Sequence, residues 1–298
     1  MTRESFLSEL QKELASLPVT EQKEALDYYR AYFEDADDDQ RVIEQLGSPQ
    51  EVARSIMEKI ASVPSVRKPE TNEGNEGHYG EFSGEEVHSL EVSIGAAEVV
   101  ITTGPKFSVE YKNIAPKNLS FGLSALGKLT ICNVASFSNF SFWMRKKDED
   151  RTPARVLIKI PENIELDYIK LSVGAGSMVT KSVSVKAKRV DLNVGAGNMV
   201  VGGVNGGTGR FKCGMGNLEY KGTVKGTVTT DCGMGKLMMA LTGNEDEYSF
   251  EGTVGLGTIQ FNRIQKDGVG KIECTNKKQN HIRANCGMGC IKISMKEN

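Results

Sequence analysis

The chain has 298 residues, with 37 Lys and Arg against 39 Asp and Glu, so its formal net charge is −2. This near-neutral balance excludes a strongly basic nucleic-acid-binding protein. With 32 Gly, one Trp and 7% aromatic residues, the composition is typical of a chain with many tight turns and not of a wide aromatic-lined core.

Residues 1–60 carry short apolar stripes at helical spacing and predict a small bundle of four short helices. Their clearest helix start is Ser48-Pro49-Gln50-Glu51, a capping box with Pro at the first helical position. Gly47 suits the left-handed end of the preceding helix. This segment holds 14 acidic and 7 basic residues, which leaves 25 acidic and 30 basic residues in the rest of the chain. The two parts therefore have opposite charge.

The segment after these helices predicts a domain boundary. Residues 62–86 are rich in Pro, Gly, Glu and Ser and lack apolar periodicity, which is the composition of a linker. We therefore expect a helical domain over residues 1–61, a linker over 62–86 and a second domain over 87–298. The whole is an α+β multidomain chain.

The N-terminal segment is charged and amphipathic, without the apolar core of a signal peptide. The sequence also lacks an apolar run of the roughly 20 residues that span a bilayer. These two features predict a cytoplasmic protein that is at most peripherally associated with the cell envelope.

Internal repeats dominate the second domain. Six blocks share one template with two glycines flanking a single residue: LSVGAGSMVT (171–180), LNVGAGNMVV (192–201), FKCGMGNLEY (211–220), TDCGMGKLMM (230–239), GTVGLGTIQF (252–261) and ANCGMGCIKI (284–293). Their first glycines are 21, 19, 19, 22 and 32 residues apart. A period near 20 residues predicts a parallel, β-helix-like β-solenoid with its strands stacked coil on coil.

Alternation within the template assigns the faces of the strands. The residue before the first glycine is always Val or Cys and is predicted to point inward, whereas the residue before that is always polar and is predicted to point outward. Cys213, Cys232 and Cys286 occupy the inward position and Cys290 an outward one, so the four thiols should not converge on one metal ion. We expect reduced, packed thiols, no metal and no cofactor.

Residues 105–165 are less regular and predict an irregular insert or cap. A hairpin is expected around Leu119 to Val134. The aromatic residues Phe137, Phe140, Phe142 and Trp143 are expected to cover the open edge of the solenoid.

Candidate partner-binding residues lie in the helical domain. Tyr28 and Tyr32 stand beside an apolar helical stripe and could anchor an interface, although core packing is the other reading of these two side chains. Asp35, Asp37 and Asp38 predict an exposed acidic surface that a basic partner could recognise. We find no catalytic constellation and expect the protein not to be an enzyme.

Two family resemblances follow from these residues. The aromatic cluster Tyr28-Tyr29-Tyr32-Phe33, together with Leu46-Gly47-Ser48-Pro49 and Ala53, resembles the HAAS domain of DUF1700 proteins. That resemblance implies a signalling module associated with PadR-like transcriptional regulators. The strand Val156 to Glu162, followed by the Gly-Ala-Gly repeats, resembles the DUF4097 family from about residue 87 to the C-terminus. That resemblance implies a β-strand-repeat, adhesin-like domain.

Together these features predict a non-enzymatic bacterial scaffold or signalling protein, in which the helical module docks a protein partner on a β-solenoid platform. One alternative is an adhesin-like surface-binding protein. The other is a polysaccharide-active β-helix enzyme, which would need clustered acidic and basic side chains on one outer face.

Overall fold

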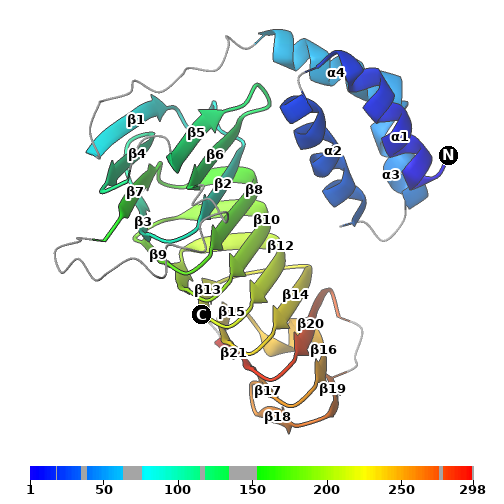
Figure 1. Ribbon diagram of the computed structural model, residues 1–298. Coiled ribbons are helices and arrows are strands. Elements are labelled where there is room, and N and C mark those ends of the chain that lie inside the picture. The colour runs from blue at the N-terminus through cyan, green and yellow to red at the C-terminus, as the bar shows by residue number, and fades with distance from the viewer. Residues whose placement is uncertain are drawn as a thin grey trace, which may run out of the picture. The chain divides into compact units, whose positions relative to one another are not determined.

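The computed structural model describes residues 1–17, 19–34, 39–62, 76–114, 118–133, 153–274 and 278–296 (Figure 1). The chain forms two compact units, one of Met1–Arg67 with Leu123–Lys128 and one of Lys68–Gly122 with Leu129–Asn298. The first is helical and the second is mainly β. Within the described ranges, no helix has both the length and the apolar character needed to cross a membrane.

The helical unit contains the four predicted helices. They are α1 (Arg3–Glu13), α2 (Val19–Glu34), α3 (Asp39–Leu46) and α4 (Pro49–Ser62), with one 3-10 turn at Leu14–Ser16. All four contribute buried apolar side chains to one core: Phe6, Leu10, Leu14, Ala25, Leu26, Phe33, Val42, Val52, Ala53 and Ile56. The rings of Phe6 and Phe33 meet edge to face with centroids 5.5 Å apart. The unit therefore has a hydrophobic core of its own.

The helix boundary at Gly47 forms as predicted. Gly47 has φ of 77°, the left-handed conformation that ends α3. The Glu51 N–H donates to Ser48 Oγ at 3.2 Å, and the Ser48 N–H donates back to Glu51 Oε2 at 3.0 Å. The hydrogen bond from the Ser48 backbone N–H is the main reason that the pKa of Glu51 is lowered. The capping box thus fixes where α4 begins.

The β unit consists of two mixed sheets. In spatial order, the 11-stranded sheet contains β1 (Glu76–Phe82), β4 (Phe107–Lys112), β7 (Arg155–Ile160), β3 (Glu98–Thr103), β9 (Ser177–Lys181), β11 (Asn198–Gly202), β13 (Asn217–Gly222), β15 (Lys236–Thr242), β21 (Cys290–Lys296), β17 (Thr258–Phe261) and β18 (Ile264–Asp267). The 10-stranded sheet contains β19 (Gly270–Cys274), β16 (Tyr248–Val254), β20 (Asn280–Cys286), β14 (Thr227–Cys232), β12 (Val204–Cys213), β10 (Val185–Val194), β8 (Ile164–Val173), β2 (Ser89–Ile94), β6 (Lys128–Asn133) and β5 (Leu119–Leu123).

Each sequence block forms one repeat unit: a strand of the 10-stranded sheet, a Gly-x-Gly turn and a strand of the 11-stranded sheet (Figure 1). Neighbouring units pair in parallel, with Val194 opposite Cys213 and Cys213 opposite Cys232. The residue before the first glycine is buried in all six units, as the alternation predicted. The inward rows of the two sheets together form the core of the β unit.

The turn glycines are required by the close approach of neighbouring backbones. A Cβ on Gly197 would lie 2.2 Å from the Gly176 oxygen, and one on Gly216 would lie 2.0 Å from the Gly197 oxygen. At the same turns, backbone hydrogen bonds continue from unit to unit, with the Asn217 N–H donating to the Gly197 oxygen at 3.0 Å. Only glycine lets the ladder pass through the turn without a clash.

The spatial order of the last units differs from their chain order. A stack in chain order would place the 284–293 block after the 252–261 block, but β20 lies between β14 and β16, and β21 lies between β15 and β17. The antiparallel edge strands β18 and β19 close the end of the stack. Strand β20 of the last unit is buried at alternate residues, which suits an internal position. Strand β18 is mostly exposed, which suits an edge.

The described parts of residues 105–165 are more regular than predicted. Strands β4 and β7 extend the 11-stranded sheet, because their alternate apolar residues continue its buried face. Strands β5 and β6 form the predicted hairpin, closed by the Ser124 N–H donating to the Lys128 oxygen at 2.9 Å. The aromatic residues predicted to cap the edge (Phe137, Phe140, Phe142 and Trp143) lie outside the described residues.

The predicted linker is shorter than expected at its C-terminal end. Residues 76–82 form β1, which pairs antiparallel with β4, so backbone pairing overrides the Gly- and Glu-rich composition of that stretch. Residues 63–75 lie outside the described residues.

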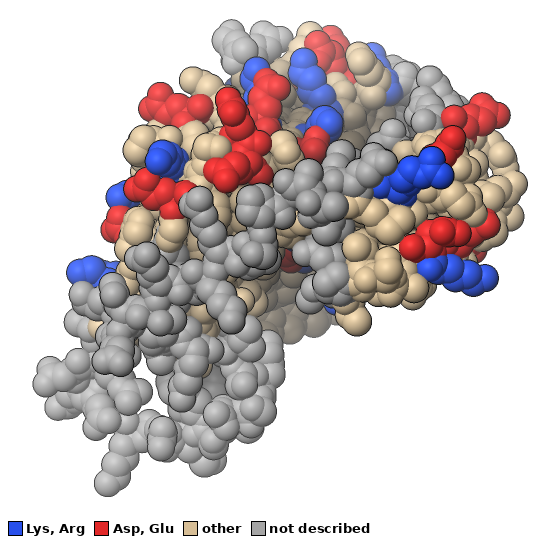
Figure 2. Space-filling view, turned by 90° about the horizontal axis from the view of Figure 1, so that it is seen from above, with Lys and Arg blue, Asp and Glu red and all other residues tan. Residues whose placement is uncertain are grey.

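Outward rows of the β unit carry ion pairs between neighbouring strands. Lys170 Nζ lies 2.8 Å from Glu91 Oε1, and Arg283 pairs with Glu251. Both pairs join residues that face each other across adjacent strands. Acidic and basic side chains are interspersed on the face seen in Figure 2.

Substituting Gly216 by Ala tests the close approach at the turns. Because the new Cβ would meet the fixed Gly197 oxygen at 2.0 Å, the free energy of unfolding should fall by more than ~2 kcal/mol. Gly202→Ala is the matched control, since a Cβ there meets nothing within 4 Å. Denaturant unfolding of both variants measures the difference, and equal losses would contradict the steric explanation.

Candidate functional site

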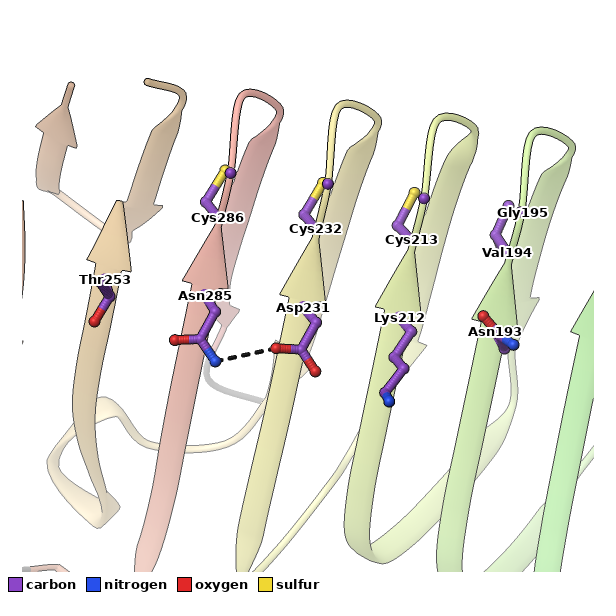
Figure 3. Close-up of a pocket in the computed structure, with 13 residues that line it drawn as sticks. Asn193, Val194, Gly195, Lys212, Cys213, Asp231, Cys232, Thr253, Asn285 and Cys286 are labelled. Carbon is purple, nitrogen blue, oxygen red and sulfur yellow. Dashed lines mark hydrogen bonds between the residues drawn. The ribbon is translucent and has the colours of Figure 1, made fainter. Parts of the chain in front are cut away.

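An open groove of about 640 Å³ runs across the ends of five strands of the 10-stranded sheet, just before their Gly-x-Gly turns (Figure 3). Four of the strands contribute the same three residues of the repeat and β16 contributes only Thr253, so the lining residues are in register. They are Asn193, Val194, Gly195, Lys212, Cys213, Gly214, Asp231, Cys232, Gly233, Thr253, Asn285, Cys286 and Gly287. Equivalent positions of the repeat, one set from each strand, therefore line a single groove.

The outer surface of the groove is a row of polar side chains. In spatial order, Asn193, Lys212, Asp231, Asn285 and Thr253 lie opposite one another on neighbouring strands. Asn285 Nδ2 donates to Asp231 Oδ1 at 3.0 Å (Figure 3). Parallel strands are spaced by about 4.8 Å, so the row presents one hydrogen-bonding group at each such step. That arrangement suits an extended ligand with repeating polar groups.

Beneath this row lies a ladder of three buried thiols, Cys213, Cys232 and Cys286, on neighbouring strands (Figure 3). Cys213 Sγ donates to the Gly216 oxygen at 3.1 Å, and Cys232 Sγ donates to the Gly235 oxygen at 3.2 Å. The inward placement of the three thiols was predicted correctly. Cys213 and Cys232 thus each help hold the turn of their own unit.

The thiols influence each other's ionisation. A hydrogen bond from Cys232 lowers the pKa of Cys213 to about 7, even though burial alone would raise it. That same hydrogen bond, together with burial, raises the pKa of Cys232. Burial also raises the pKa of Cys286. Of the Cys213–Cys232 pair, Cys213 is therefore the thiol that loses its proton first.

Metal binding was considered for the same cysteines. In the part of the chain that the structure describes, there is no group of three or more His, Cys, Asp or Glu side chains that could hold a metal ion. Cys290 is the first residue of β21, directly after the turn of its unit, at the outward position predicted for it.

The helical unit has a smaller hollow of about 200 Å³ along α1 and α2. Its lining residues are Gln11, Val19, Gln22, Lys23, Leu26 and Arg30. Val19 is 79% exposed, which is unusual for a large apolar side chain at the start of a helix. This hollow combines an exposed apolar residue with basic neighbours, and the sequence patterns did not single it out.

The predicted partner-binding residues are placed only in part. Tyr28 and Tyr32 belong to α2, but their side chains lie outside the described residues, as do Asp35, Asp37 and Asp38 entirely. Their neighbour Tyr29 is half-buried and packs against the core of the helical unit. Partner binding by the five residues stays a prediction.

Comparison with known families identifies the helical unit. Residues 5–55 match the HAAS family model, which covers the four helices. The N-terminal part of the chain is therefore a HAAS domain, as its residues predicted. No curated protein matches the chain. The resemblance of residues 87–298 to DUF4097 stays a prediction.

The chain is similar to three solved structures at low sequence identity. A "putative cell adhesion protein" from Clostridium sporogenes ATCC 15579 is 19% identical, covers 78% of this chain and 100% of its own, and has a TM-score of 0.39. A "putative adhesin" from Bacteroides fragilis NCTC 9343 is 11% identical, with coverages of 73% and 95% and a TM-score of 0.33. A "putative lipid binding protein" from Parabacteroides distasonis ATCC 8503 is 14% identical, with coverages of 74% and 97% and a TM-score of 0.33.

Replacing Cys232 by Val tests the coupling within the thiol ladder. Val fits, because Val173, Val194 and Val254 occupy the same position in other units. Loss of the Cys232 hydrogen bond should raise the pKa of Cys213 well above its value of about 7. Thiolate absorbance measured against pH reports the change.

Cys286→Val is the matched control, since it removes a thiol from the same row but leaves the Cys213–Cys232 pair intact. That variant should keep the titration near pH 7. A titration near neutrality that survives in Cys213→Val would belong to another thiol and would contradict the assignment.

Proposed function

Because residues 5–55 form a HAAS domain, we propose that this chain is a non-enzymatic binding protein whose helical unit docks a protein partner. In this proposal the stacked repeat units form a β-solenoid that serves as a platform. A PadR-like transcriptional regulator is the partner class that the sequence resemblance favours. The observation that carries the proposal is that the helical unit is a complete domain with its own core.

The core of the helical unit supports a docking role. Its buried side chains come from all four helices, so the unit holds its shape through contacts among its own helices. Val19 stays 79% exposed beside Lys23 in the hollow along α1 and α2. Exposed apolar residues next to charged ones are typical of surfaces that become buried on association.

Charge supports the choice of a basic partner surface. The first 60 residues hold twice as many acidic as basic side chains. Long-range attraction between such a unit and a basic patch speeds association and disfavours acidic partners. The β unit has the opposite balance, so the two units should not share the same partner surface.

The platform role is supported by the continuity of the backbone ladder. Hydrogen bonds run from unit to unit through both sheets and through the turns between them. A stack held in this way deforms little, because bending it would break hydrogen bonds in both sheets at once. A rigid platform limits the entropy lost when a partner binds.

The docking proposal is tested with two sets of changes in the full-length chain. Tyr28→Ala/Tyr32→Ala removes the predicted anchors, and Asp35→Asn/Asp37→Asn/Asp38→Asn removes the predicted acidic surface. A partner is first co-purified from the native host, identified by mass spectrometry and purified. Each set of changes should then raise its Kd at least about tenfold in calorimetric titrations.

Glu4→Gln/Glu13→Gln/Glu44→Gln is the matched control for charge, because it removes three carboxylates from exposed positions of α1 and α3. This variant should keep the affinity of the unchanged chain to within about threefold. A partner that binds all variants equally would show that docking lies outside the helical unit.

The in-register polar row of the groove favours a second candidate, an adhesin-like function in which the β unit binds an extended polar ligand such as a glycan. Asn193 and Asn285 present side-chain amides on the same face of their strands, and both are exposed. Amides donate and accept hydrogen bonds, which is the capacity that hydroxyl-rich chains require. This candidate places recognition in the β unit.

Asn193→Ala/Asn285→Ala tests the second candidate on an array of bacterial glycans. Binding of any glycan that the unchanged chain captures should fall at least about tenfold, because two hydrogen-bonding side chains are lost. Asn198→Ala/Asn217→Ala is the matched control, since these amides lie beyond the turns, on the other sheet. Equal capture by all three proteins would refute binding in the groove.

A further inference from the structure

Four large apolar side chains are exposed at the turns of neighbouring repeat units. Met215, Met234, Met288 and Leu256 each occupy the middle of a Gly-x-Gly turn and are 63, 54, 59 and 74% exposed. In the described part of the chain only three other large hydrophobic residues, Met1, Val19 and Val269, are at least 54% exposed, and none of those three lies in such a turn. We name Met215, Met234, Met288 and Leu256 the tip row.

The topology of the last unit brings the tip row together. In the chain, Leu256 comes between Met234 and Met288, but β20 and β21, the strands of the unit that carries Met288, insert between the units that carry Met234 and Leu256. The Met288 N–H donates to the Gly233 oxygen at 2.8 Å, and the Leu256 N–H donates to the Gly287 oxygen at 2.8 Å. The spatial order is therefore Met215, Met234, Met288, Leu256.

The tip row forms a straight line. Its turns are joined by the same hydrogen bonds from one unit to the next, so they stand side by side at one edge of the stack (Figure 3). With neighbouring strands about 4.8 Å apart, the four tips extend over roughly 14 Å. All four can therefore reach a flat surface at the same time.

The turn does not require large apolar side chains. Ala175 and Ala196 occupy the same middle position in the two preceding units, and their turns make the same backbone hydrogen bonds. The tip residues are mostly exposed, so they contribute little to the core. Large exposed apolar residues in a contiguous set commonly mark a surface that another apolar phase covers.

Positive charge flanks the tip row on both sides. Lys212 lies on β12 before the Met215 turn, and Lys236 lies on β15 after the Met234 turn; both are exposed. The carboxylate closest to the row in the repeat template, Asp231, lies opposite Lys212 on the neighbouring strand and accepts a hydrogen bond from Asn285. At the equivalent flanking positions, Asn217 and Thr258 are uncharged.

We propose that the tip row inserts its apolar side chains into the interface of an anionic lipid bilayer, while Lys212 and Lys236 contact the headgroup phosphates. A straight row of protruding tips fits a planar, deformable phase better than a protein surface, which would need a matching groove. Flexible Met side chains adapt to such a phase at little entropic loss. Cations beside an apolar row add attraction to anionic lipids. The proposal concerns the β unit and does not depend on the partner of the helical unit.

Vesicle flotation of the full-length protein tests this proposal. The protein should float with vesicles of phosphatidylglycerol and phosphatidylcholine in equal parts, and at least about tenfold less with phosphatidylcholine alone. Met215→Ala/Met234→Ala/Met288→Ala should lose at least about tenfold in affinity for the anionic vesicles. Because Ala already occupies this position in other units, the variant should keep its thermal unfolding midpoint.

Two further variants separate the contributions of sulfur, apolar area and charge. Met215→Leu/Met234→Leu/Met288→Leu should bind as the unchanged chain does, because apolar area is what the bilayer requires. Lys212→Gln/Lys236→Gln should bind both vesicle types equally, at the level of the unchanged chain on phosphatidylcholine.

Ile264→Ala/Val269→Ala is the matched control, since both residues are exposed apolar residues away from the tip row. It should leave vesicle binding unchanged. Failure of the unchanged chain to float with anionic vesicles overturns the proposal, as does an equal loss in this control. So does light scattering that shows a dimer lost only in the Met→Ala variant, because the tip row would then join two copies of the chain.

Discussion

The β unit depends on one steric constraint, the close approach of neighbouring backbones at the Gly-x-Gly turns. The second glycine of each turn lies against the carbonyl of the unit before it, at a distance that excludes a Cβ. Because of this contact, the hydrogen-bond ladder passes from one sheet through the turn to the other without a break. Every unit therefore has the same height and register as its neighbours.

The same register produces three different surfaces from one template. The residue before the first glycine points inward and gives the thiol ladder, and the residue before that one points outward and lines the groove. The residue between the glycines protrudes, and there large side chains can vary without disturbing the stack. Residues such as Cys213, Lys212 and Met215 thus have separate roles although they are adjacent in the chain.

Much of the fold could be predicted from local patterns, because helix caps and strand alternation act over a few residues. Gly47, Ser48 and the Val or Cys before each turn are examples whose structure matches the prediction. The position of β20 could not be predicted, since all repeat units offer equivalent edges and only tertiary packing chooses among them. The groove could not be predicted for a related reason. Its polar row combines residues from five strands that are separate in the sequence, whereas each repeat contains only one residue of that row.

The inserted last unit also bears on how the chain reaches its folded state. In an array stacked in chain order, the final repeat can be removed and the remaining units keep their neighbours. Here β16 and β17 pair in parallel only with β20 and β21, among the described strands, so their place in the stack depends on strands that follow them in the chain. Stacking from the N-terminal side cannot continue past β14 and β15 until β20 and β21 have paired with them. Because these contacts join residues far apart in the chain, we expect this region to fold slowly.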